Sequence, residues 1–123
     1  MVGYTHIQFM ELAILKAIIE YWAANGRAPS KDLLFPTLVN DWLKNAGAVE
    51  AGYTNPLTSN TRFTQAIKAL RRLGYLTDSR FYTPSETAPT LFELLGDDWR
   101  QWPVRIPILG NILNFDEATY VLE

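Results

Sequence analysis

Apolar residues recur at helical spacing in two long stretches of the chain. The first stretch covers residues 7–25, and Gly26 follows it as a natural helix terminator. The second runs from Ser59, a good helix cap, to Gly74, which suits a left-handed stop. At about 100° per residue, one face of this stretch carries Phe63, Ala66, Ile67, Leu70 and Leu73, and the opposite face carries Thr61, Gln65, Lys68 and Arg72. The pattern predicts two helices. The apolar stripe of the first is wide, so this helix is expected to pack at the centre of the domain, whereas the second has one buried face.

A further helix is predicted between these two. Pro36 would remove a hydrogen bond from a helix interior, so the helix is expected to begin at Pro36 and to end at Gly47. A short helical turn over residues 31–34 precedes it. The segment 47–57 is rich in turn residues and is longer than the tight turn that joins two helices of a helix-turn-helix.

The segment after Gly74 has β-forming character. Residues 75–83 alternate roughly, residues 84–89 supply a turn, and residues 90–95 are expected to form a returning strand. Three helices followed by two strands predict a winged helix-turn-helix fold, mainly α with a small β wing. Residues 1–95 would form this domain, and residues 96–123 a linker and C-terminal arm. Residues 105–123 are expected to form a strand or arm that packs on the domain or on a second subunit.

The charge of the chain is distributed unevenly. The net charge is −2 and the isoelectric point is about 5.4, yet five cations and one acid lie between residues 59 and 80. A locally basic element on a slightly acidic protein indicates a binding face for phosphate. The alternative is an ordinary solvated helix, in which Arg71 and Arg72 only complement the negative end of the helix.

Three segments resemble parts of LexA-type repressors. "ILKAIIEYWAANGRAPSKDLL" and "TQAIKALRRLGYL" are similar to the first helix and the recognition-helix tail of their N-terminal domain. "WPVRIPILGNI" resembles the junction before their self-cleaving domain, but Leu113, Asn114 and Phe115 replace the Ala-Gly cleavage site, and no Ser-Lys dyad follows before Glu123. The resemblance implies a transcriptional regulator that binds duplex DNA and has no peptidase.

The resemblance and the chemistry of DNA recognition together suggest roles for individual residues. Amides and hydroxyls read base edges, while long cations neutralise the backbone. We assign Ser59, Asn60, Thr61, Thr64 and Gln65 to base edges. We assign Arg62, Lys68, Arg72 and Arg80 to phosphates.

The C-terminal region carries candidate interface residues. Trp99 and Trp102 either seal the underside of the domain or anchor a partner, and Ile108 lies in an apolar tail that needs cover. A homodimer is expected. The alternative function is a protein adaptor or antirepressor, because a fold of this kind serves both purposes.

No catalytic constellation is apparent. The chain has no cysteine, and its one histidine, His6, has no ligand partner at metal-binding spacing. Asp97 and Asp98 are neighbours that point apart. We expect no enzyme activity, no metal, no cofactor and no membrane span. The composition is consistent with a cytoplasmic location.

Overall fold

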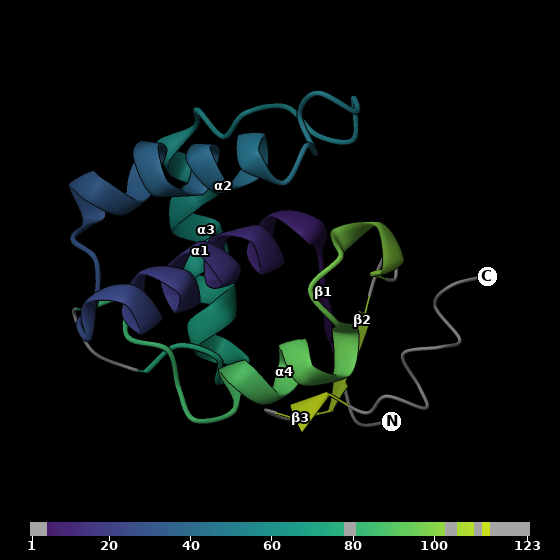
Figure 1. The fold of residues 1–123 in the computed structure, drawn as a ribbon. Coiled ribbons are helices and arrows are strands. Elements are labelled where there is room, and N and C mark those ends of the chain that lie inside the picture. Colours follow the sequence, from purple (N-terminus) through teal and green to yellow (C-terminus); the bar gives the residue numbers. More distant parts are fainter. Residues whose placement is uncertain (1–4, 78–80, 103–105, 110–111, 114–123) are drawn as a thin grey trace.

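The computed structural model describes residues 5–77, 81–102, 106–109 and 112–113. Six helical segments and three short strands lie in these ranges (Figure 1). The helical segments are α1 (Phe9–Asn25), η1 (Leu33–Leu38), α2 (Val39–Asn45), α3 (Asn60–Arg72), α4 (Ala88–Leu95) and η2 (Trp99–Gln101). The strands are β1 (Thr5–Ile7), β2 (Ile106–Leu109) and β3 (Ile112–Leu113).

Helix α1 is the centre of the fold and contacts α2, α3 and α4 (Figure 1). Its first two turns are buried almost all round, which explains the wide apolar stripe in the sequence. Gly26 ends the helix with φ 69°, and its N–H donates to the carbonyl of Trp22 at 2.8 Å. This left-handed conformation favours glycine, because glycine has no Cβ. The first predicted helix is therefore confirmed.

The second predicted helix is also present. Phe35 has φ −122° and ψ 123°, so the helical path is broken immediately before Pro36. Helical structure resumes at Pro36, continues through α2, and Gly47 follows with φ 81°. A short turn of helix precedes the break, as the position of the proline predicts.

Helix α3 has the capping and the two faces that its sequence predicts. The Ser59 hydroxyl accepts from the N–H of Arg62 at 3.1 Å, and Gly74 has φ 84°. The buried residues are Phe63, Ala66, Ile67 and Leu70, and the exposed residues include Thr61, Gln65, Lys68 and Arg72. The apolar face contacts the core that α1 organises.

The predicted wing, and with it the winged helix-turn-helix fold, is wrong. Residues 90–95 belong to helix α4, and Leu76 and Pro84 are joined by one isolated bridge where two full strands were expected. The reason lies in the spacing of Ala88, Leu91, Phe92 and Leu95, which follows the helical period and buries all four side chains. Pro89 is also tolerated in the first turn of a helix.

The strands of the structure lie elsewhere. They form one antiparallel sheet in the order β1, β2, β3, with Ile7 opposite Ile106 and Ile108 opposite Leu113. The C-terminal segment, for which a strand or an arm is expected, contributes two strands, and one of them pairs with the beginning of the chain. This pairing joins residues about a hundred positions apart, which no local pattern reveals.

Aromatic rings connect the start of α1 to the segment after α4. Phe9 lies 5.8 Å from Trp99 and 5.9 Å from Trp102, measured between ring centroids. Trp102 also stacks on Trp42 at 6.0 Å and contacts Phe92 at 5.6 Å. The cluster fastens the turn of residues 96–102 to α1 and α2.

Candidate nucleic-acid interface

The exposed face of α3 is a straight stripe of polar residues. Thr61, Gln65, Lys68 and Arg72 follow one another at intervals of three or four residues, so they lie on one side of the helix. At 1.5 Å per residue the stripe is about 16 Å long. Asn60 is exposed at its N-terminal end. The stripe contains no acidic residue.

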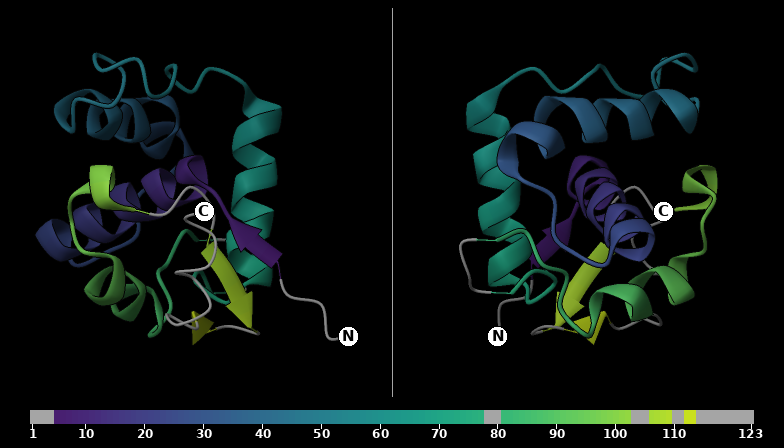
Figure 2. Two further views of the ribbon diagram at one scale, coloured as in Figure 1. Left: turned by 90° about the vertical axis from the view of Figure 1, so that its right-hand side faces the viewer. Right: turned by 60° about the vertical axis from the view of Figure 1, so that its left-hand side comes forward.

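Helix α3 stands at one side of the molecule. In the left view of Figure 2, α1 and α2 lie on one side of α3, and the C-terminal end of α1 points away from it. The exposed stripe is opposite the apolar face that packs on α1. This position leaves the stripe accessible to a large partner.

A pair of side-chain hydrogen bonds sets where α3 begins. The Asn40 amide donates to the carbonyl of Leu57 at 2.8 Å, and its oxygen accepts from the N–H of Leu57 at 2.7 Å. The long linker between α2 and α3 is therefore attached to α2 two residues before the Ser59 cap. The sequence alone does not reveal this role, because an asparagine on a helix gives no sign of a backbone partner 17 residues away.

One of the predicted phosphate ligands, Arg62, has an acidic partner within the protein. Arg62 pairs with Glu11 at 2.9 Å, and Glu11 is only 9 % exposed. Glu11 also accepts from the backbone N–H of Gln8 at 3.1 Å and so completes the N-terminal cap of α1. Arg62 thus compensates a largely buried charge and is withdrawn from the phosphate set. Arg80 lies outside the described residues.

The remaining cations of α3 differ in their surroundings. The guanidinium of Arg71 lies 5.6 Å from the centre of the Tyr82 ring, and Arg71 is half-buried. Burial raises the pKa of the Tyr82 phenol, and the charge of Arg71 partly offsets this effect. Lys68 and Arg72 are exposed, and no carboxylate within the described ranges pairs with them.

The predicted base-reading residues fall into two groups. Asn60, Thr61 and Gln65 are exposed on the stripe. Ser59 is also exposed, but its hydroxyl is already an acceptor in the helix cap, and Thr64 is half-buried. The structure brings the first three residues together on one surface with Lys68 and Arg72.

The predicted partner residues Trp99 and Trp102 lie in the core of their own chain. Each is 6 % exposed. The indole of Trp99 donates to the carbonyl of Ala46 at 2.7 Å, and that of Trp102 donates to the carbonyl of Gly96 at 2.8 Å. Of the two interpretations of these residues, core packing is therefore the observed one. Ile108 lies in β2, and its side chain is outside the description.

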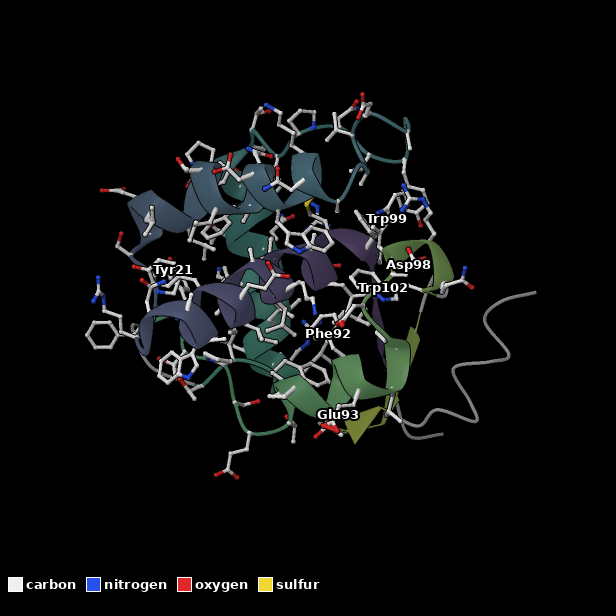
Figure 3. All side chains as sticks on the ribbon, viewed as in Figure 1. Tyr21, Phe92, Glu93, Asp98, Trp99 and Trp102 are labelled. Carbon is white, nitrogen blue, oxygen red and sulfur yellow. The ribbon has the colours of Figure 1, made fainter. Side chains whose placement is uncertain are left out.

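A groove lies on the other side of α1, between α1, α2 and the turn of residues 97–100. It has a volume of about 760 Å³. Tyr21 and Asp98 mark its two ends in Figure 3, and Trp99 lies beside Asp98. The groove is lined by four carboxylates and two cations. They are Glu20, Asp41, Asp97, Asp98, Lys16 and Arg100.

The two adjacent aspartates of the groove have separate structural roles. Asp97 accepts a hydrogen bond from Lys16 at 2.6 Å, and this contact holds the pKa of its carboxyl below the usual range. Asp98 accepts from the N–H of Arg100 at 3.0 Å and so caps η2. The two carboxylates do not form an acid and base pair. Within the described ranges no group of three or more histidine or acidic side chains is arranged to hold a metal ion.

Comparison with models of protein families, with curated proteins and with solved structures gives no match for this chain. None of the helices that the structure describes is both long and apolar enough to pass through a bilayer.

Proposed function

We propose that this protein binds duplex DNA through the outward face of α3 and acts as a sequence-specific transcriptional regulator. The observation that carries the proposal is the combination of Asn60, Thr61 and Gln65 with two cations, Lys68 and Arg72, that have no acidic partner among the described residues. Amides and hydroxyls read bases, and such cations bind phosphate. The proposal depends on this surface and not on a winged architecture.

The dimensions of the stripe support this proposal. The major groove of B-DNA is about 12 Å wide and admits one α-helix. Thr61, Gln65 and Lys68 span the first two to three turns of α3, the part of a recognition helix that usually meets base edges. The helix N-terminus also has a partial positive charge, which favours approach to a phosphate backbone.

The pairing of the other charges supports a particular orientation. Arg62 is neutralised by Glu11, and the groove on the far side of α1 has an excess of carboxylates. Helix α3 itself contains no acidic residue and carries two exposed cations without a described acidic partner, and the carboxylate-rich groove would face away from DNA. A charge separation of this kind orients a protein on its approach to a polyanion.

Few phosphates would be neutralised by so small a set of cations. Lys68 and Arg72 alone would give a logarithmic salt slope of about −2 for one chain, and a contact from Arg80 would make it about −3. A homodimer on two half-sites would double these values. Discrimination between sequences would depend on Gln65, Thr61 and Asn60.

The test measures fluorescence anisotropy of labelled duplexes, first as a random pool and then as sequences selected from that pool. We expect Arg72→Ala to weaken binding to every duplex by a similar factor. Gln65→Ala should change the preference at one base position by about 1–3 kcal/mol. Arg27→Ala is the matched control, because Arg27 is exposed and follows the C-terminal end of α1 by two residues, and that end of α1 points away from α3 (Figure 2).

Two results would overturn the proposal. One is the absence of duplex binding at low salt by a protein whose circular dichroism shows that it is folded. The other is an equal loss of affinity for Arg27→Ala and Arg72→Ala, since this would mean that positive charge anywhere on the protein drives the binding.

A further inference from the structure

The groove between α1 and α2 has an unbalanced set of charges. Lys16 is 2.6 Å from Asp97, and Arg100 is 3.7 Å from Asp98. These contacts account for both cations of the lining. Glu20 and Asp41 are exposed and have no cationic partner among the described residues. One carboxylate comes from α1 and the other from α2, so they line the groove from two different helices.

Aromatic rings lie beside these two carboxylates. The indole of Trp42 donates to Glu20 at 3.2 Å, and Tyr21 lines the end of the groove near Asn25. At the other end of the groove, two cations of the protein itself lie over aromatic rings. Arg100 lies 4.6 Å from the centre of the Trp99 ring, and Lys16 lies 4.9 Å from that of Phe92. Cations over aromatic faces are attracted by the ring quadrupole.

The groove is long enough for several residues of an extended chain. Its lining on α1 runs from Lys16 to Asn25, a length of about 14 Å at 1.5 Å per residue. An extended peptide covers this length with about four residues. The volume of about 760 Å³ is also within the usual range for ligand sites.

We propose that this groove binds a short lysine- or arginine-containing segment of a partner protein. One basic side chain of the segment lies between Glu20 and Asp41, against Trp42, and the backbone of the segment follows α1 toward Tyr21. Charge complementarity selects the basic partner, and the length of the groove selects a peptide. The groove and the α3 stripe are on different sides of α1, so this site does not depend on DNA binding.

The test uses the full chain and a labelled, blocked hexapeptide with two lysines, followed by fluorescence anisotropy at low and at physiological salt. A peptide with glutamines in place of the lysines controls for binding that does not need charge. The double variant Glu20→Gln, Asp41→Asn removes the unpaired carboxylates and keeps the shape of both side chains. Glu93→Gln is the matched control, because Glu93 is exposed on α4 outside the groove (Figure 3).

We expect the double variant to weaken binding of the lysine peptide by about tenfold, since each exposed ion pair is worth a factor of about 2 to 5. Glu93→Gln should bind as the original protein does. Equal binding of the glutamine peptide, or no loss in the double variant, would overturn the proposal. Displacement of the peptide by spermidine at a concentration equal to the peptide's dissociation constant would also overturn it, because the site would then recognise a small cation and not a peptide.

Discussion

Asn40 offers the sharpest test of how α3 is positioned. Its side chain makes two hydrogen bonds to the backbone of Leu57, at 2.7 and 2.8 Å, and Leu57 is 4 % exposed. Asn40→Ala removes both bonds and leaves one N–H and one carbonyl of a largely buried residue without these partners. With a net value of about 0.5–1.5 kcal/mol for each bond, the free energy of unfolding should fall by about 1–3 kcal/mol.

Urea unfolding followed by circular dichroism measures this loss from the shift of the midpoint at constant slope. Asn45→Ala is the matched control, because Asn45 is an exposed asparagine near the end of the same helix and should change stability by less than about 0.5 kcal/mol. Hydrogen exchange adds a local measurement, since the amides of the first turn of α3 should exchange faster in Asn40→Ala. Equal midpoints for the two variants would refute the idea that Asn40 fastens the linker to α2.

Two further predictions concern packing and pH. Phe63 is 1 % exposed and stacks on Phe35 with 4.8 Å between the ring centroids. Phe63→Ala should therefore destabilise the protein by about 3–5 kcal/mol, whereas Gln65→Ala should change its stability by no more than about 0.5 kcal/mol. Similar urea midpoints for the two variants would mean that α3 faces the other way. The hydrogen bond from Lys16 lowers the pKa of the Asp97 carboxyl below its ordinary value of 3.8. The contact therefore stabilises the folded protein above pH 3.8, and this contribution to the free energy of unfolding is lost as the pH falls through the lowered pKa. Asp97→Asn should therefore lower the urea midpoint slightly at neutral pH and by a shrinking amount as the pH falls below 3.8, and a difference that does not shrink in acid would exclude this origin.

Local patterns in the sequence determined α1 and α3. Each has a long apolar stripe at the helical period and a glycine after its last turn, and α3 has Ser59 as a cap. These signals act between residues three or four positions apart, so they do not need the rest of the fold. The exposed stripe of α3 could be predicted for the same reason, and the break before Pro36 follows from the ring of that one residue.

Tertiary structure decided the identity of α4 and the sheet. An apolar run as short as residues 90–95 fits either a strand or a helix, and contact of Leu91, Phe92 and Leu95 with the core selects the helix. The pairing of β1 with β2 joins the two ends of the chain, and no short window contains both partners.

The two candidate surfaces depend on the sequence and on the fold in different ways. Only the fold brings Glu11 to Arg62 and so removes one of the cations that the α3 sequence offers to phosphate. The groove likewise combines Glu20, Asp41 and Asp98 from three separate segments, and none of these segments is distinctive alone. A face on one helix can be predicted from periodicity, whereas a site assembled from distant segments exists only after they pack together.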